Sequence, residues 1–474
     1  MSMFPIHVRA WARMLPVAAG LLIGSMSVLQ AQADGTFDPS FAQGTGFAGD
    51  VYAMVRQPDG KLVIGGNQLS LYNGTAVPSV VRLGADGALD GTFDAGSGPD
   101  GWIHDLALQT DGKVLVVGTF SNFNGLSSRR LVRLMPNGSV DTGFNIGTAA
   151  NDWVTSVVVQ PDGKILIAGH FDQFNGTAAG GVARLLPDGT LDPAFNAGTG
   201  ADQEVNVIVL RPDGRILLGG YFTTFSGATR NKVVQLNADG SLDASFDPGA
   251  GGGSSASVRA MVLAPDGKVL CGGNFWDWSG STANGAVRLL TDGSPDPAFD
   301  ASATSEYGIT DIRLQPDGNI LLSGTMGLKR VTTTGAVDPA FSTGTGFFGG
   351  LQVVVSLLLL PDGRIMAGGQ FNEYDGNAVG SIVRITGANV GMDEEAVARL
   401  RAWPNPTSGT VQVAMEQGTP PAALVVLDPL GRIVQRLDPG RGITTVELPP
   451  APGVYMLEAR YATGAVVRMP VVRR

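Results

Sequence analysis

Short apolar runs recur along most of the chain, and each is bounded by turn-forming residues. In residues 154–196 the runs VTSVVVQ, KILIAG and GVARLL are separated by PDG, by the loop HFDQFNG and by a second PDG before TLDPAFN. Apolar runs of this length, rich in Val, Ile and Leu and flanked by Gly, Pro, Asn or Asp, are typical of strands in antiparallel sheets. The pattern predicts a unit of four short antiparallel strands.

This unit repeats with a period of about 51 residues. A PDG-type turn, a D-x-x-F segment and a strand similar to V-R-L each occur seven times. The turn aspartates are Asp59, Asp111, Asp162, Asp213, Asp266, Asp317 and Asp362, and the D-x-x-F segments end at Phe41, Phe93, Phe144, Phe195, Phe246, Phe299 and Phe341. A four-stranded unit of roughly 50 residues repeated four to eight times indicates the blades of a β-propeller.

The order of the motifs predicts how the ring closes. The first D-x-x-F segment precedes the first strand, and none follows the last V-R-L-like strand at Ile382 to Ile385. We therefore expect the N-terminal segment to supply the outer strand of the last blade. This predicts an all-β, seven-bladed propeller over residues 34–386. The alternative is an open solenoid, which would need capping ends rather than this offset.

The repeats also resemble a known family. A DGxxDxxF-type segment, followed by QPDGKILxGGxF and an aromatic-Asn-Gly loop, is similar to the delta-60 repeat of bacterial secreted proteins. The resemblance covers roughly residues 34–386. It implies a β-propeller and secretion, and it brings no catalytic residues with it.

Composition and charge narrow the class of protein further. The chain has 68 Gly among 474 residues and only 16% charged residues, which excludes a coiled coil and a disordered chain. The net charge of −10 argues against nucleic acid or an anionic membrane as a partner. Residues 1–33 are typical of a secretory signal peptide, with Arg9 and Arg13 before an apolar run that is short for a stable membrane span. An uncleaved anchor is the alternative.

The C-terminal segment has a different composition. After a predicted linker at 387–398, residues 399–474 contain five apolar stretches separated by Gly and Pro turns, which predict a small Ig-like β-sandwich. Residues 395–474 hold nine Arg, no Lys and six acidic residues. This part of the chain is therefore basic, whereas the repeats are acidic.

Four motifs give the C-terminal segment a second resemblance. WPNPTSG, DPLGR, PGVY and the final Arg pair are similar to the type A sorting domain of the type IX secretion system, although Trp403 stands where that family usually has Tyr. The matching residues are Pro404, Asn405, Pro406, Gly409, Gly431, Arg432, Gly453 and Tyr455. The resemblance implies export to the periplasm, recognition by the outer-membrane secretion machinery, and a product that is secreted or attached to the outer cell surface. An ordinary accessory sandwich is the alternative.

The sequence shows no recognisable catalytic or metal-binding constellation. His104 and His170 lie in different repeats, outside any H-E-x-x-H or G-x-S-x-G motif, and are expected to be structural. Cys271 is expected to be a small buried hydrophobe. The repeated aspartates lack the spacing of calcium loops and are interpreted as turn residues. We therefore expect no enzymatic activity, no cofactor and no metal.

A ligand site is expected on the face that carries the longer loops, because the other face has only tight hairpins. Nine residues before each turn Asp, equivalent positions differ widely among the repeats, so the fold itself does not dictate them. The candidate ligand-binding residues are Trp102, Trp153 and Glu204 at these positions, His104, Arg259 and Tyr307 near them, and Trp276 in a long loop. The two tryptophans at these positions are expected either to stack on a sugar or grip a peptide, or to fill the channel as core.

These observations predict a secreted or surface-attached, non-catalytic propeller that binds a glycan or a protein. Two alternatives remain open. One is a glycoside-active enzyme, in which Asp50 and Glu204 would be the pair of catalytic carboxylates. The other is a purely structural repeat protein of the cell envelope.

Overall fold

The computed structural model describes residues 34–304 and 308–387, together with 400–403, 407–415, 423–428, 433–437, 444–450, 453–460 and 466–473. Over these ranges the chain is built from strands and one 3-10 turn, η1 (Ser302–Thr304), which confirms the all-β prediction. None of the helical structure in these ranges is long and apolar enough to cross a membrane. The predicted signal peptide lies outside the described residues, as does the predicted linker apart from Gly387.

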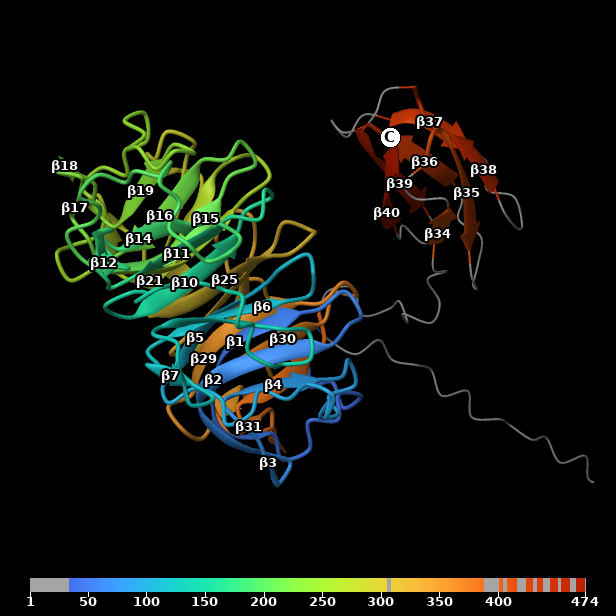
Figure 1. Ribbon diagram of the computed structural model, residues 1–474, viewed down its shortest axis with the longest axis horizontal. Coiled ribbons are helices and arrows are strands. Elements are labelled where there is room, and N and C mark those ends of the chain that lie inside the picture. Colours follow the sequence, from blue (N-terminus) through green and yellow to red (C-terminus); the bar gives the residue numbers. More distant parts are fainter. Residues whose placement is uncertain are drawn as a thin grey trace, which may run out of the picture. The chain divides into compact units, whose positions relative to one another are not determined.

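Antiparallel sheets with three main strands follow one another along the chain, one for each sequence repeat (Figure 1). The first strands are β1 (Phe47–Arg56), β5 (Ile103–Leu108), β10 (Val154–Val159), β15 (Val205–Leu210), β20 (Ser257–Leu263), β25 (Ile309–Leu314) and β29 (Val353–Leu359). The middle strands are β2 (Leu62–Tyr72), β6 (Val114–Gly118), β11 (Ile165–Gly169), β16 (Ile216–Gly220), β21 (Val269–Asn274), β26 (Ile320–Gly324) and β30 (Ile365–Gln370). The third strands are β4 (Val80–Leu83), β9 (Leu131–Leu134), β14 (Val182–Leu185), β19 (Val233–Leu236), β24 (Ala286–Leu289), β27 (Gly327–Val331) and β33 (Ile382–Ile385).

The first strands pack against one another in a closed series. Each contacts the first strand of the next sheet, and β29 of the last sheet contacts β1 of the first. The blue β1 and the orange β29 accordingly lie side by side in Figure 1. Neighbouring sheets share buried apolar clusters, as where Val117 of β6 packs with Ile167 of β11. The core of this region therefore lies between the sheets, which is why the middle strands are apolar on both faces.

The D-x-x-F segment is not the fourth strand that we predicted. It makes only one isolated bridge to its sheet, as in the pairs Leu83 with Leu89 and Leu134 with Val140. The Asp side chain explains the difference, because Asp90 Oδ1 accepts the N–H of Thr92 at 3.0 Å. This bond turns the chain within two residues instead of extending it. The PDG aspartates act in the same way, since Asp59 Oδ1 accepts the N–H of Lys61 at 3.1 Å.

The longer loops fold into two-residue ribbons whose aromatic side chains pack inward. Phe120 and Phe123, for example, are fully buried, so these aromatic side chains are packing residues. The sixth repeat lacks such a ribbon, because Gly324 of β26 pairs directly with Gly327 of β27. The short strands are β3 (Thr75–Ala76), β7 (Asn122–Phe123), β8 (Leu126–Ser127), β12 (Gln173–Phe174), β13 (Thr177–Ala178), β17 (Thr224–Phe225), β18 (Ala228–Thr229), β22 (Asp277–Trp278), β23 (Ser281–Thr282), β28 (Phe347–Phe348), β31 (Glu373–Tyr374) and β32 (Asn377–Ala378).

The C-terminal part contains two further antiparallel sheets, ordered β34-β35-β38 and β37-β36-β39-β40. Apolar side chains from both sheets, including Val413, Val426 and Leu457, form one buried cluster. The strands are β34 (Leu400–Trp403), β35 (Thr410–Met415), β36 (Ala423–Leu427), β37 (Ile433–Leu437), β38 (Thr444–Glu447), β39 (Gly453–Arg460) and β40 (Val466–Arg473).

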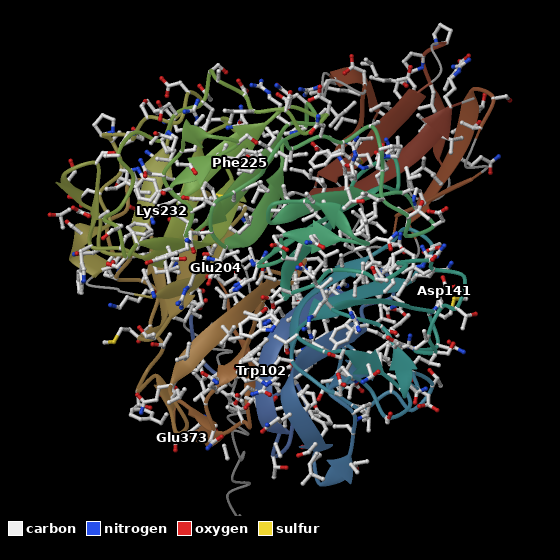
Figure 2. All side chains as sticks on the ribbon, turned by 60° about the vertical axis from the view of Figure 1, so that its left-hand side comes forward. Trp102, Asp141, Glu204, Phe225, Lys232 and Glu373 are labelled. Atoms are coloured by element: carbon white, nitrogen blue, oxygen red, sulfur yellow. The ribbon has the colours of Figure 1, made fainter. Side chains whose placement is uncertain are left out.

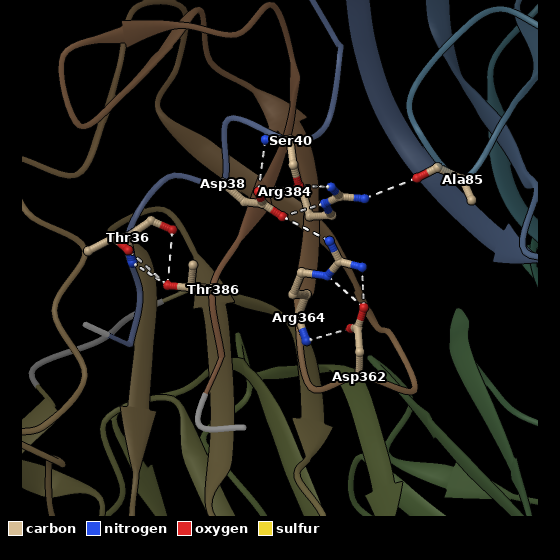
Figure 3. Close-up of polar contacts among 8 residues, drawn as sticks. All are labelled: Thr36, Asp38, Ser40, Ala85, Asp362, Arg364, Arg384 and Thr386. Carbon is tan, nitrogen blue, oxygen red and sulfur yellow. Dashed lines mark hydrogen bonds and ion pairs between the residues drawn. The ribbon is translucent and has the colours of Figure 1, made fainter. Parts of the chain in front are cut away.

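The N-terminal segment docks on the last sheet, as the motif order predicts (Figure 3). Arg384 of β33 donates from Nε to Asp38 Oδ2 at 2.7 Å, and the N–H of Asp38 donates to the Arg384 carbonyl at 3.0 Å. Arg384 also donates to the carbonyl of Ala85 in the first repeat at 3.0 Å. The same arrangement occurs within the first repeat, where Arg82 donates to Asp90 at 2.7 Å. The two ends of the repeat region are thus joined by the contacts that hold the other repeats together.

Candidate binding site

The PDG hairpin determines which residues face each other where the first and middle strands meet the longer loops. The residue nine positions before the turn Asp lies opposite the residue eight positions after it, as in the pairs Asp50 with Asn67 and Ser257 with Asn274. We call these the leading and trailing positions. The leading positions are Asp50, Trp102, Trp153, Glu204, Ser257, Gly308 and Val353, and the trailing positions are Asn67, Thr119, His170, Tyr221, Asn274, Thr325 and Gln370.

A β-bulge in each first strand adds a third residue to this set. The pairing of β5 with β6 shifts register between Ile103 and Asp105, which leaves His104 as the bulged residue. Bulges re-aim a side chain relative to its neighbours. The bulged residues are Tyr52, His104, Thr155, Asn206, Arg259, Thr310 and Val355. We define the mouth as the leading, trailing and bulged residues together.

A glycine beside each trailing position lets the two strands approach closely. A Cβ added to Gly118 would collide with the carbonyl oxygen of Trp102, and one added to Gly169 would collide with that of Trp153. The Gly-Gly and Ala-Gly pairs of the sequence therefore have a steric cause. The glycines thereby fix the backbone of the leading residue and the position of the Cα atom from which its side chain extends.

Three aromatic rings gather in the first two repeats. The ring centroid of Tyr52 lies 6.1 Å from that of Trp102 and 6.5 Å from that of His104, and the Trp102 and His104 centroids are 6.4 Å apart. Trp102 remains 44% exposed, so one part of its ring is packed and another faces solvent. In Figure 2 Trp102 and Glu204 lie near the middle of the view, and Asp141 and Glu373 lie near its edges.

Gln370 connects this aromatic group to the last repeat. Its Nε2 donates to Asp50 Oδ2 at 2.9 Å and to the Tyr52 hydroxyl at 3.2 Å. Burial and the nearby Asp50 charge raise the pKa of Tyr52 above its usual value, so the hydroxyl keeps its proton. Among the described residues, the side chains that donate to the Asp50 carboxylate are the neutral amides of Gln370 and Asn67.

A second group spans the third and fourth repeats. The Trp153 and His170 ring centroids lie 5.2 Å apart, and His170 Nδ1 lies 3.5 Å from Glu204 Oε1. Trp153 is 44% exposed, like Trp102. Neither tryptophan is therefore buried in the way that a residue filling the channel as core would be.

His104 belongs to the first group and is electrostatically influenced by His170 of the second. Burial and the neighbouring His170 lower the pKa of His104 to about 4, so the ring is neutral at pH 7. Its Nε2 is buried without a hydrogen-bond partner among the described residues. A buried polar nitrogen in this state needs water or a ligand group to complete its bonding.

The structure brings some of the remaining candidates to the same region. Arg259 is the exposed bulged residue of β20, beside Ser257, which accepts a hydrogen bond from Asn206 at 2.9 Å. Trp276 is 60% exposed in the loop between β21 and β22 and belongs to none of the mouth positions. Tyr307 lies outside the described residues.

Of the trailing and bulged residues, sequence reasoning proposes only His104 and Arg259, both bulged, as ligand-binding residues. The sequence does not indicate Gln370 or Tyr52 as site residues, and it predicts a structural role for His170, which contacts the leading residues Trp153 and Glu204. The trailing residues were recoverable, because a fixed PDG turn also fixes the cross-strand partner of each leading residue. The bulge itself has no comparable signal in an apolar strand.

No metal-binding cluster is found within the described residues. Among them no three His, Cys, Asp or Glu side chains are grouped closely enough to hold a metal ion. Cys271 is buried, as expected, and burial raises its pKa. Asp50 and Glu204 come from the first and fourth repeats and have different partners, Gln370 and His170.

The C-terminal motif residues are described only in part. Tyr455 is buried in the cluster shared by the two sheets, and Gly409 and Gly453 lie at the ends of β35 and β39. Pro404, Asn405, Pro406, Gly431 and Arg432 lie outside the described residues.

A protein-family model matches six segments of the repeat region. The family described as "Domain of unknown function (DUF5122) beta-propeller" matches residues 57–93, 109–144, 160–195, 211–246, 264–299 and 360–387. Each match begins near a PDG turn, and the first five end at the D-x-x-F phenylalanine. The last match is shorter because its D-x-x-F segment stands at the other end of the chain. The sixth repeat, which lacks the long loop, has no match.

Two solved structures are similar to the chain at low sequence identity. The chain is 14% identical to PorZ of Porphyromonas gingivalis, a surface component of the type IX secretion system, covering 90% of this chain and 59% of that one at a TM-score of 0.42. It is 14% identical to the extracellular domain of a putative one-component system of B. thetaiotaomicron, covering 94% and 57% at a TM-score of 0.49. The chain thus spans less than two thirds of either structure. No curated protein matches the sequence.

Proposed function

We propose that residues 34–386 form a seven-bladed β-propeller that serves, after export, as a non-catalytic binding module, either secreted or attached to the outer cell surface. The observation that carries this proposal is the half-exposed state of Trp102 and Trp153 in neighbouring repeats. Large aromatic side chains that are partly packed and partly exposed are typical of binding surfaces. The ligand class at this level is a glycan or a protein.

The C-terminal segment is proposed to be an Ig-like sandwich that acts as a type IX sorting domain. Support comes from its four ordered motifs and from the cluster that its two sheets share. Mass spectrometry of the extracellular protein tests this role. We expect a mature N-terminus near Asp34 and loss of residues after about 399, whereas an intact C-terminus on the extracellular protein would contradict the sorting role.

Binding and catalysis are separated by one set of measurements on the purified full chain. Saturable binding of a glycan or an envelope protein, without any change in the ligand's mass, supports the binding module. Product formation from a polysaccharide that is lost on Glu204→Gln and on Asp50→Asn would instead favour the glycoside-active alternative. Absence of both binding and turnover would favour a structural envelope protein.

A further inference from the structure

We infer that the ligand of the mouth is a neutral oligosaccharide, held across the first five repeats with Trp102 and Trp153 as stacking surfaces. This inference rests on the proposed binding role and makes its ligand specific. Its first support is the position of the two rings. They occupy equivalent leading positions of adjacent repeats and are equally exposed, so they offer two similar apolar surfaces to the C–H faces of successive sugar rings.

The second support is the chemical character of the mouth. In the first five repeats every leading, trailing and bulged residue is aromatic, charged, a hydroxyl or an amide, and none is aliphatic. Aliphatic side chains appear only at the leading and bulged positions of the last repeat, Val353 and Val355. The core of a protein interface usually includes aliphatic anchors beside its aromatic residues. Aromatic faces bordered by planar polar groups instead match a ligand with C–H faces and hydroxyl edges.

The third support is a set of polar atoms without a protein partner. Asn67 Oδ1, His104 Nε2 and Asn274 Oδ1 are buried at the mouth and, among the described residues, have no hydrogen-bond partner. Two of them are acceptors only, and the histidine nitrogen is either a donor or an acceptor in the neutral ring. A sugar hydroxyl both donates and accepts, so hydroxyls on one ligand satisfy all three. The carboxylates of Asp50 and Glu204 add charged acceptors, which form the stronger hydrogen bonds.

Charge selects among carbohydrates. In the first five repeats the mouth holds two carboxylates, Asp50 and Glu204, against one exposed cation, Arg259. Asp50 is held by the neutral Gln370, and the chain carries a net charge of −10. Acidic sugars or sulfated chains would be repelled by these charges. His104 stays uncharged at neutral pH because burial and the nearby His170 lower its pKa to about 4, so it adds no positive charge to offset them. A neutral chain meets no such penalty.

The experiment uses the purified full chain and six neutral hexasaccharides: β-1,4-glucose, β-1,3-glucose, β-1,4-mannose, β-1,4-xylose, β-1,4-N-acetylglucosamine and α-1,4-glucose. Binding is measured by calorimetry and by tryptophan fluorescence. We expect at least one to bind saturably, and Trp102→Ala and Trp153→Ala each to weaken it by about tenfold or more. The control is Leu126→Ala, at an exposed loop tip of the Trp102 repeat, which should leave the affinity unchanged.

Folding of each variant is checked by its thermal melt and circular dichroism. Trp102→Phe and Trp153→Phe keep a ring and should retain more affinity than the alanine variants. The inference is overturned if none of the six sugars binds, or if binding survives both alanine substitutions. Capture of an envelope protein that depends on Trp102 and Trp153, without sugar binding, would overturn the carbohydrate inference and leave the proposed binding role standing. If the unmodified chain bound neither a sugar nor an envelope protein, the proposed binding role itself would be contradicted.

Discussion

Asp38 and Arg384, which are 346 residues apart in the sequence, form a buried ion pair with Nε and Oδ2 2.7 Å apart (Figure 3). Arg364 adds a second contact to the same carboxylate at 3.3 Å, and the guanidinium of Arg384 lies over the ring of Phe41 at 4.9 Å. The pairing of Arg82 with Asp90 and of Arg184 with Asp192 repeats this geometry. The same Arg-Asp contact therefore occurs within other sheets. In the last sheet the Asp comes from the N-terminal segment of the repeat region.

The first prediction concerns this closing pair. Asp38→Ala should lower the free energy of unfolding by about 3–5 kcal/mol, because it leaves the buried Arg384 charge unpaired. Chemical denaturation followed by tryptophan fluorescence measures the effect. The matched control is Lys61→Ala, which removes the exposed partner of Asp90 and should change stability by less than about 1 kcal/mol. If Asp38→Ala and Lys61→Ala lowered the free energy of unfolding equally, the closing pair would stabilise the fold no more than an exposed ion pair.

Deletion of the N-terminal segment tests closure on a larger scale. Removing residues 34–48 from the full chain deletes Asp38, Phe41 and the backbone bonds between Thr36 and Thr386. The last sheet then loses its covering segment, and we expect the single cooperative transition of residues 34–386 to broaden or split. An unchanged melting curve would contradict closure by the N-terminus.

A second prediction follows from the close approach of strands at the mouth. Gly118→Ala should destabilise the protein by about 1–3 kcal/mol, because the new Cβ collides with the Trp102 carbonyl and forces the backbone to shift. The thermal melt measures this change. Gly91→Ala is the control, since a Cβ there meets no atom within 4 Å and should change stability little. If Gly118→Ala left the melting temperature unchanged, the two strands would be able to move apart without loss of stability.

A third prediction concerns pH. Asp105 lies in β5, where its carboxylate accepts the N–H of Val157 at 2.9 Å and that of Leu106 at 2.8 Å. Burial outweighs these bonds and raises the pKa of Asp105 to about 6. The folded state therefore binds a proton that the unfolded state, with a pKa of about 3.9, has already released. Stability from this group is fully present below about pH 4 and is lost as the pH rises towards 6.

Asp105→Asn should remove this part of the pH dependence, whatever its effect on absolute stability. Unfolding free energies measured from about pH 2 to 7 show whether the slope between pH 4 and 6 disappears. Asp141 provides the control with opposite sign. Burial alone would raise its pKa, but the bonds from Lys113 and Arg133 lower it, so its contribution is present above about pH 4 and is lost on further acidification. An unchanged slope in Asp105→Asn would contradict the assignment.

The sequence allowed the repeat, the turns and the closing segment to be predicted because these depend on local signals. Asp59 and Asp162 mark hairpins whose side-chain bonds are local, and the early position of Asp38 shows that a segment is shared between the chain's ends. The role of Arg384 is not predictable in this way, because the V-R-L motif indicates only an apolar strand. Its guanidinium is buried through contacts with residues distant in sequence, which no local pattern reports.

The mouth was predictable only in part for a similar reason. Variation among repeats pointed to Trp102 and Trp153, and cross-strand register would have added His170. The aromatic contact of Tyr52 with Trp102 depends on a β-bulge and on the packing of β1 against β5. A period-two strand pattern contains neither feature.

Hydrogen exchange shows whether the mouth is the surface through which the protein binds its ligand. Amide exchange of the full chain is compared by mass spectrometry with and without a saturating ligand found in the binding assays. We predict slower exchange in peptides that contain Trp102, Trp153 and Glu204, and unchanged exchange at the PDG turns on the opposite side of each hairpin. Protection confined to the PDG turns or to the C-terminal sheets would contradict ligand binding at the mouth.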